Sequence, residues 1–589
     1  MRKQFWYALG LGARIATAAT PADSIYEHGY VYTVDPAQSV QQAVAVRDGR
    51  VVYVGNDTGV QAFIGPQTRI EDLRGRMMMP GLIDGHMHPL AGGHSLLGCN
   101  LNYERLTEAQ FAARIQSCLN DSRDQEPNGW LAVKNWFQEA MIGNTVMSRA
   151  VLDRLDTRRP IFILSSFGHT ALANSRALTL AHIDARSPDP RGGQIHHDAR
   201  GEPTGLLEDA AMRAVQAALP PPTAAENVKA AAVAVSALNA QGVTTFLDAA
   251  ADRTTLAAFA AVSGDGKLTV RAHFAVLITP QAAVDPIKAV AAAHALAQQF
   301  DQGPLKPRAG LSVHNIKLFL DGVITAPALT GNMMAPYLVN QGTPQQPHWV
   351  TGPSSGPAVY FQPQTLKVLL PEAARLGLEP HFHADGDGAV HAALDATAML
   401  RQQFPASQIR VAIAHDEIVD PRDFPRYQEL GAVPVLSFQW EKPAPDTVDG
   451  ARDYLGPQRY RYMEPAGFLA DAGAPIAFGS DWPVDRLDEW FALKVGVTRT
   501  NAPDVDPKYR GRLSQDRGLT RAQVLRAITL GAAYELHEEA SVGSIEPGKL
   551  ADLVILDRNV MQIPAADIAH VRILATIVGG ARVYGAAPP

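Results

Sequence analysis

Short apolar runs alternate with longer amphipathic stretches through the middle of the chain. Thr223 with Glu226, and Thr520 with Gln523, have the spacing of capping boxes at the starts of two helices. Eight apolar runs are typical of buried parallel strands: 82–88, 243–248, 268–278, 313–320, 381–383, 410–415, 434–438 and 476–481. Eight strands that alternate with helices predict an α/β fold, a distorted (β/α)8 TIM-type barrel.

Both ends of the chain are β-rich instead. The segment from residue 24 to about 79 consists of short alternating runs and turns, and Asp48-Gly49 between two apolar runs indicates a hairpin. The segment 540–589 has the same character, with a turn at Gly579-Gly580. We predict one small β-sandwich assembled from 24–79 and 540–589, with the barrel over 80–539.

About 150 residues separate the first two predicted strands, far more than one crossover helix needs. We therefore predict an inserted subdomain over about 95–225, above the barrel mouth. It contains Trp130, Trp136, Phe137 and Phe167. These aromatic residues either meet an apolar substrate group or form the core of the subdomain.

Composition narrows the class of partner. The chain has 52 Lys and Arg against 59 Asp and Glu, a net charge of −7, and no basic block. This balance argues against nucleic acid as a partner. No run of about 18 apolar residues is present, which argues against a membrane span. A monomer and a homo-oligomer remain open.

The N-terminus has the pattern of a secretory signal peptide. Arg2 and Lys3 precede a largely apolar stretch, and Ala16-Thr17-Ala18 resembles a cleavage site, which predicts a signal peptide over 1–23 and a periplasmic or secreted protein. Arg14 interrupts the apolar stretch, so a frayed N-terminus of a cytoplasmic protein is the alternative. The two cysteines, Cys99 and Cys118, could bridge in an oxidising compartment.

Metal-binding chemistry is indicated at the strand ends. His86 and His88 are two residues apart on a predicted strand, so their imidazoles share one face and can bind a borderline metal such as zinc. Alone, such a pair is a weak signal. However, His383, His415 and Asp481 also end predicted strands, and a barrel places its catalytic groups at these ends.

Lys317 faces the same way as Asn315 and Phe319, toward the predicted barrel interior, whereas Ile316 and Leu318 face outward. A bare ammonium there is costly to desolvate. Carboxylation by CO2 would convert it into an anion that can bridge two cations. The alternative is a lysine whose amine reaches the barrel rim.

Five motifs carry a family resemblance. They are 80–88 (PGLIDGHMH), 316–322 (IKLFLDG), 383–387 (HADGD), 479–483 (GSDWP) and 543–552 (GSIEPGKLAD). The chain resembles the amidohydrolase superfamily, in its N-substituted formamide deformylase-like branch (amidohydrolase family 3). The resemblance spans nearly the whole chain after about residue 24.

The resemblance implies two divalent metal ions, usually zinc, bridged by carboxylated Lys317 and a hydroxide. It implies that His86 and His88 hold the first ion and that His383 and His415 hold the second. Asp481 would bind the first ion and move protons, which makes it the catalytic residue. With the bridging groups counted, the site keeps a net charge near +1, which would favour an oxyanion at the substrate carbonyl.

The chain departs from the branch at three positions. It has Ala414 where the branch usually has glutamate, and Asp385 and Gly388 where the branch often has isoleucine and arginine. No predicted ligand is lost, but the pocket could be reshaped. The run 168–175 resembles a motif of the branch's insertion, so His169 is a candidate substrate contact, as is Trp136; a structural role for His169 is equally open.

The sequence thus predicts a metal-dependent hydrolase that cleaves a C–N bond in a small amide-like substrate, an N-substituted amide or formamide. A bridging hydroxide would attack the carbonyl, and Asp481 would pass the proton to the departing amine. One alternative is an ester, lactone or carbamate hydrolase, since the same site stabilises the same tetrahedral intermediate. Another is a non-catalytic, metal-binding regulatory protein.

Overall fold

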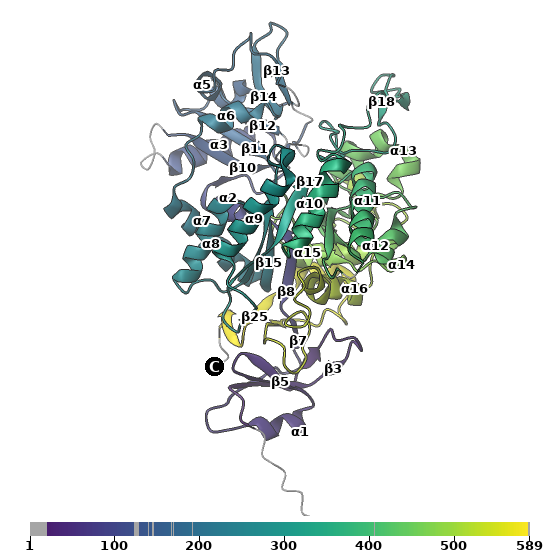
Figure 1. Ribbon diagram of the computed structural model, residues 1–589. Coiled ribbons are helices and arrows are strands. Elements are labelled where there is room, and N and C mark those ends of the chain that lie inside the picture. The colour runs from purple at the N-terminus through teal and green to yellow at the C-terminus, as the bar shows by residue number, and fades with distance from the viewer. Residues whose placement is uncertain are drawn as a thin grey trace, which may run out of the picture.

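The computed structural model describes residues 20–122, 129–138, 141–143, 146–166, 168, 170–190, 193–405 and 407–586. Most of the predicted signal peptide therefore lies outside the described residues. In Figure 1 the chain forms a central barrel, with β-sheets from the chain ends below it and the insertion above it at the left.

The barrel is one sheet of eight parallel strands in the order β23-β22-β21-β20-β17-β16-β15-β8. These strands are β8 (Leu82–Met87), β15 (Val243–Ala251), β16 (Arg271–Leu277), β17 (Leu311–Phe319), β20 (Glu379–Ala384), β21 (Val411–His415), β22 (Ala432–Leu436) and β23 (Ala477–Phe478). All eight predicted strands are present, so the predicted TIM-type barrel is confirmed.

Helices cover the outside of the sheet (Figure 1). They include α7 (Ala224–Gln241), α8 (Arg253–Gly264), α9 (Pro286–Phe300), α10 (Pro363–Arg375), α11 (Asp387–Gln403), α12 (Phe424–Leu430), α15 (Glu489–Thr498) and α16 (Arg521–Arg526). The capping boxes at Thr223 and Thr520 open α7 and α16 as predicted. On β17, Ile316 and Leu318 pack into the core that the sheet shares with these helices. Lys317, between them, points inward, as the alternation predicted.

The first and last barrel strands meet through backbone hydrogen bonds just beyond β23. The Asp481 N–H donates to the His86 carbonyl at 2.7 Å, and the His88 N–H donates to the Trp482 carbonyl at 2.7 Å. Gly479 permits this approach, because a Cβ there would lie 2.4 Å from the His86 Cβ. The barrel therefore closes at the segment that carries the predicted ligands of the first metal ion.

Two sheets built from the chain ends share one apolar core below the barrel. The four-stranded sheet contains β5 (Arg50–Gly55), β4 (Ala43–Arg47), β1 (Ser24–Glu27) and β6 (Arg69–Asp72). The six-stranded sheet contains β26 (Ala581–Tyr584), β25 (Ile573–Val578), β24 (Leu553–Leu556), β7 (Met77–Pro80), β2 (Tyr30–Tyr32) and β3 (Val40–Gln41). Both ends of the chain thus contribute to one sheet.

Two local features, a hairpin and a buried ion pair, hold these sheets in place. The predicted hairpin joins β4 and β5 at Asp48 and Gly49, whose φ angles of +51° and +72° suit a tight turn. A fully buried ion pair connects the barrel to the C-terminal segment: the Arg271 guanidinium donates to both carboxylate oxygens of Asp552, at 2.6 and 2.9 Å.

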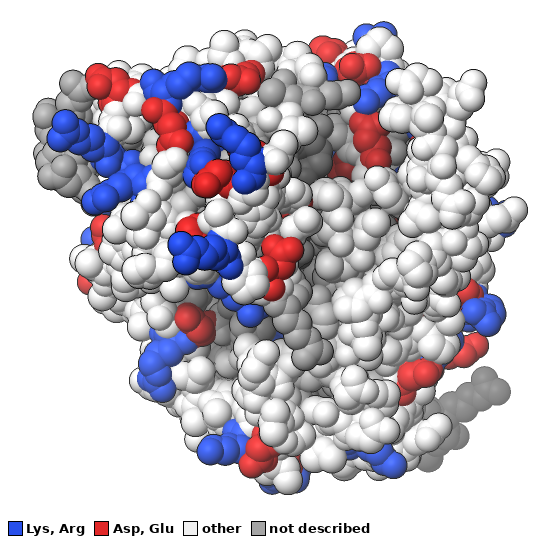
Figure 2. All heavy atoms as spheres, turned by 90° about the horizontal axis from the view of Figure 1, so that it is seen from above, with Lys and Arg blue, Asp and Glu red and all other residues white. Residues whose placement is uncertain are grey.

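The insertion forms its own six-stranded sheet in the order β13-β14-β12-β11-β10-β9. Its strands are β9 (Cys99–Asn100), β10 (Leu131–Trp136), β11 (Ile161–Ser165), β12 (Thr170–Ala173), β13 (Gly193–His197) and β14 (Pro203–Asp209). A hydrogen bond from the Tyr103 hydroxyl to the Pro483 carbonyl, at 2.6 Å, ties the insertion to the loop after β23. In Figure 2, which shows this end of the molecule from above, Lys and Arg gather on the side of the insertion.

Cys99 and Cys118 form a disulfide that joins β9 to α3 (Glu108–Asp121). The bridge closes the start of the insertion on itself. Within the described part of the chain, no helix is long and apolar enough to cross a membrane.

Candidate metal centre

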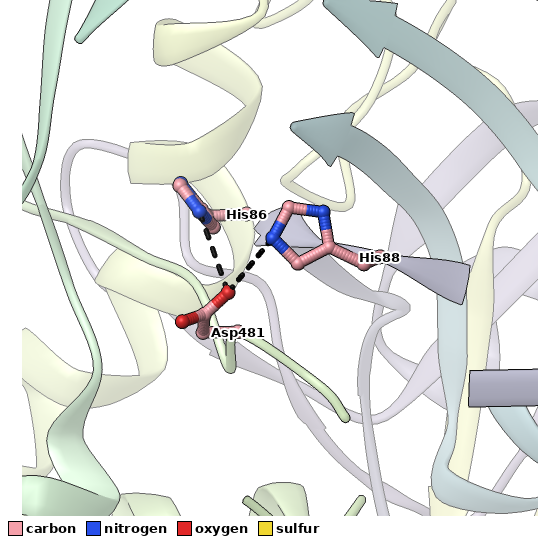
Figure 3. A group of neighbouring side chains, drawn as sticks. All are labelled: His86, His88 and Asp481. Atoms are coloured by element: carbon pink, nitrogen blue, oxygen red, sulfur yellow. Dashed lines mark ion pairs between the residues drawn. The ribbon is translucent and has the colours of Figure 1, made fainter. Parts of the chain in front are cut away.

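His86, His88 and Asp481 converge at the point where the barrel closes (Figure 3). The Asp481 Oδ1 lies 3.1 Å from the His88 Nε2 and 3.5 Å from the His86 Nε2. His86 and Asp481 are buried, whereas the His88 side chain is one quarter exposed. Two imidazoles and a carboxylate form a donor set that suits zinc and leaves room for a further ligand.

The backbone around this group is held by the buried carboxylate of Asp84. Its Oδ1 accepts the His86 N–H at 3.0 Å, and the same carboxylate accepts the Ser480 N–H at 3.1 and 3.2 Å. One side chain thus connects the residue before Asp481 to the strand that carries the histidine pair.

A second set of contacts orients the His86 ring. The His86 Nδ1 lies 2.7 Å from the His381 Nε2, and the His381 Nδ1 lies 3.2 Å from Glu535. Gly85 leaves space for this carboxylate, because a Cβ there would lie 2.0 Å from the Glu535 Oε2. The arrangement occupies one nitrogen of His86 and leaves Nε2 facing Asp481, a geometry typical of metal-binding histidines.

His383, Asp385 and His415 form a second donor group, with one potential ligand atom from each lying within 4.8 Å of the others. The ring centroid of His415 is 4.5 Å from that of His383 and 4.7 Å from that of His86. The two groups therefore adjoin. Asp385 was not among the predicted ligands, and the one signal for it in the sequence is the acidic residue where the branch often has isoleucine.

Lys317 is fully buried beside the first group. Its Nζ lies 3.4 Å from the His86 Nε2 and 4.7 Å from the centre of the Phe319 ring. Burial lowers the pKa of Lys317 to about 7, against the opposing effects of Asp481 and Asp385, with which it interacts electrostatically. A large share of this amine is therefore neutral near neutral pH.

Two properties of the donor groups fit metal ions: histidines are neutral, and two carboxylate oxygens lack hydrogen-bond partners within the described part of the chain. Burial lowers the pKa of His86 and of His415 well below the usual value, so these imidazoles are neutral and offer lone pairs. Among the described residues, the Asp481 Oδ1 and the Asp385 Oδ1 are buried without a hydrogen-bond partner. Buried oxygens of this kind are costly unless a cation or donor meets them.

The backbone is strained at two of the donor residues. His415 and Asp481 have φ angles of +82° and +55°, in the left-handed region that disfavours residues with a Cβ. Such strain costs about 1–3 kcal/mol per residue and concentrates at functional sites. The fold therefore holds both side chains in place at an energetic cost.

A cavity of about 430 Å³ is lined on one side by Trp440, a neighbour of the second donor group. The Trp440 side chain lines the cavity and stacks on His415, with ring centroids 5.6 Å apart. The insertion contributes Tyr103, Phe137 and Ser166 to the wall. Loops at the mouth of the barrel contribute most of the remaining wall, so the cavity lies between the barrel and the insertion.

The structure places Trp136 away from this cavity. Its side chain is 1% exposed in the core of the insertion, where it packs on Phe111 with ring centroids 5.6 Å apart. The neighbouring residue, Phe137, lines the cavity instead. Sequence alone could not tell which of the two aromatic residues points outward at the irregular end of β10. His169 lies outside the described residues.

These positions make a paired prediction. Phe137→Ala should change kcat/KM unequally across a substrate series and leave metal content near the wild-type value, because Phe137 lines the cavity wall and belongs to neither donor group. Trp136→Ala should instead lower stability by about 3–5 kcal/mol, the usual cost of removing a buried Trp. Kinetics, metal analysis and thermal unfolding of both variants test this. Equal losses for every substrate in Phe137→Ala would contradict a role in specificity.

Comparison with known proteins agrees with the geometry. A family model described as "Amidohydrolase family" matches residues 69–584. The protein LONG AFTER FAR-RED 3 of Arabidopsis thaliana is 26% identical over 582 residues, covering 96% of this chain and 92% of the relative. The N-substituted formamide deformylase of Arthrobacter pascens is 25% identical over 572 residues, covering 94% of this chain and 97% of the relative.

Among solved structures, a metal-dependent hydrolase of uncharacterised function from Pyrococcus horikoshii OT3 superposes with a TM-score of 0.69. It is 21% identical, and the match covers 92% of this chain and 99% of the other. This similarity concerns the fold. The family model matches most of the sequence, and this match shows that the chain belongs to the amidohydrolase family.

Proposed function

We propose that this protein is a binuclear metal-dependent hydrolase that cleaves a C–N bond in a small amide-like substrate, such as an N-substituted amide or formamide. The observation that carries the proposal is the pair of adjoining donor groups, with buried Lys317 beside them, at the catalytic end of the barrel. The full-length similarity to a relative named N-substituted formamide deformylase supports the choice of bond.

The donor set assigns a place to each ion. His86, His88 and Asp481 would hold the first divalent ion, and His383 and His415 the second, with zinc as the metal that suits imidazole and carboxylate donors. Bound there, the two ions would supply an activated water molecule and polarise the substrate carbonyl.

Lys317 would connect the two ions as a carbamate. Its neutral amine, favoured by burial, can form an N–C bond to CO2 with loss of one proton, which converts a neutral group into an anion. A lysine that stayed cationic in this position would repel both ions. The reaction removes that repulsion and leaves two oxygen ligands close to His86.

Asp481 would move the proton. Its Oδ1 faces both histidines of the first group and has no hydrogen-bond partner among the described residues, so it can accept a proton from the attacking water and donate it to the leaving amine. The cavity that Trp440 lines would hold the substituent of the substrate and limit access of bulk water.

Hydrolysis of a substrate panel tests the reaction class. The metal-loaded protein should release an amine from N-substituted formamides or other amides in a panel that also contains matched esters, lactones and carbamates, with products identified by mass spectrometry. If the protein hydrolyses only the esters, lactones or carbamates, the assignment to amide C–N bonds is wrong. A protein with both ions bound and no turnover of any class would overturn the proposal of an enzyme.

The role of Lys317 predicts a change in metal content. Lys317→Ala should leave fewer than two ions per chain after dialysis, because the bridging anion is lost while the histidines remain. Metal analysis of the variant beside wild type measures this. Short carboxylic acids added to the variant should restore part of the second ion. Full metal content together with full activity in Lys317→Ala would rule out the bridge.

The role of Asp481 predicts a loss of rate. Asp481→Asn keeps the shape and one oxygen ligand but removes the basic carboxylate, so kcat should fall by about 10²-fold or more, the scale of general acid–base catalysis. Much of the metal should remain bound. The measurement is kcat with metal content determined on the same sample. If kcat is unchanged with both ions present, Asp481 is a ligand alone.

A further inference from the structure

We propose that Asp385 is a third protein ligand of the second metal ion, so that this ion is held by His383, His415 and the Asp385 carboxylate. The proposal rests on the proposed metal-dependent function and goes beyond it, because the ligand set implied by the family resemblance does not contain this residue. At this position the branch often has isoleucine, which cannot bind a metal.

The Asp385 side chain lies beside both histidines. Its Oδ1 is 3.5 Å from the His383 Nε2, a nitrogen that also donates to the Gly322 carbonyl at 3.0 Å. One potential ligand atom from each of Asp385, His383 and His415 lies within 4.8 Å of the others. The residue is 2% exposed. Its Oδ1 has no hydrogen-bond partner among the described residues, so the oxygen nearest to the histidines lacks a compensating donor.

The loop that carries Asp385 is held by another carboxylate. Asp321 accepts the backbone N–H groups of Asn332, Asp385 and Gly386 at 2.8, 3.1 and 2.9 Å. The Asp385 carbonyl accepts the Ile418 N–H at 3.1 Å. The backbone is thus held from both sides, and the side chain is directed at the histidines. Both oxygens of Asp321 are engaged by these N–H groups, so Asp321 does not compete as the ligand.

The electrostatic surroundings call for a cation. Asp385 interacts electrostatically with the carboxylates of Glu417, Asp321 and Asp481. The Glu417 Oε2 is also buried without a partner among the described residues, although Glu417 lies outside the converging group. A divalent ion between Asp385 and the two imidazoles would replace repulsion among these carboxylates by attraction.

The added carboxylate changes the chemistry of the second ion. Two imidazoles and a carboxylate are a complete set of three protein ligands for zinc and leave a coordination position for substrate or water. The second ion then depends less on the Lys317 bridge. The extra negative charge lowers the net charge of the centre from near +1 to near neutral, so the second ion binds more tightly and polarises a carbonyl less.

Metal binding by the full-length chain, measured without substrate, tests this assignment. The protein is stripped of metal and titrated with Co²⁺ alone, with uptake followed by absorption and confirmed as ions per chain by elemental analysis. Four variants are compared with wild type: Asp385→Asn, Asp385→Ile, His415→Ala as a reference for loss of a second-site imidazole, and Asp387→Asn as the control. Asp387 is close in sequence, but its Oδ1 accepts the Met334 N–H at 2.7 Å and it is outside the donor group.

Wild type and Asp387→Asn should each take up two ions, and each site should have the same affinity in the variant as in wild type. Asp385→Asn should bind the first ion as wild type does and the second at least about 10-fold more weakly, as His415→Ala does. Asp385→Ile, which restores the residue common in the branch and removes a buried charge, should show the same loss. If Asp385→Ile keeps the wild-type affinity at the first site, that variant is folded. It then tests the assignment even if Asp385→Asn fails to fold.

Second-ion affinity in both Asp385 variants equal to that of Asp387→Asn would overturn the assignment. Failure of the hydrolase proposal looks different: wild type would bind two ions and turn over no member of the substrate panel. The two outcomes are read from separate measurements, so each proposal can fail alone.

Discussion

The candidate metal centre depends on how the last barrel strand meets the first. β23 is only two residues long, so a regular ladder cannot align Asp481 with the histidines of β8. Backbone hydrogen bonds from Asp481 to His86 and from His88 to Trp482 join the two segments, and the buried Asp84 carboxylate adds a side-chain link by accepting N–H groups of both His86 and Ser480. Together these contacts bring the three side chains of the first donor group to one point.

The buried charges of the protein differ in how completely they are paired. Structural pairs are complete: Arg271 is bound to Asp552 between the barrel and the C-terminal segment, and Arg499 is bound to Glu441 at 3.1 Å. At the barrel mouth, by contrast, Asp481 and Asp385 keep oxygens without partners among the described residues. In the part of the chain that the structure describes, unpaired buried oxygens also occur at Glu489 and Glu535, outside the donor groups. At the barrel mouth the oxygens adjoin neutral imidazoles, so a cation there would offset the cost of burying them.

The barrel and the insertion contribute different parts of the site. The predicted metal ligands all come from barrel strands or the loops that directly follow them, whereas the insertion contributes Tyr103, Phe137 and Ser166 to the cavity wall. A rigid barrel holds ligands at short distances, and an attached subdomain can vary in shape without disturbing them. The hydrogen bond from Tyr103 to Pro483 keeps this wall next to the loop that follows Asp481.

The sequence by itself determined the barrel, since apolar runs of strand length alternate with helices, and it placed His86, His88, Lys317, His383, His415 and Asp481 at or near the same ends of strands. A period of two residues encodes which face of a strand a side chain occupies, so the inward direction of Lys317 was predictable. The hairpin at Asp48-Gly49 and the two capping boxes were also predictable, because each depends on a few neighbouring residues.

Only the tertiary structure decided the rest. The approach of Asp385 to the histidines depends on Asp321, 64 residues earlier, which holds its backbone. The His86 to His381 contact joins residues 295 apart. The choice of Phe137 over Trp136 as the cavity residue depends on how β10 ends. These outcomes arise from the closure of the barrel and the packing of loops, which bring together groups whose separation along the chain carries no local pattern.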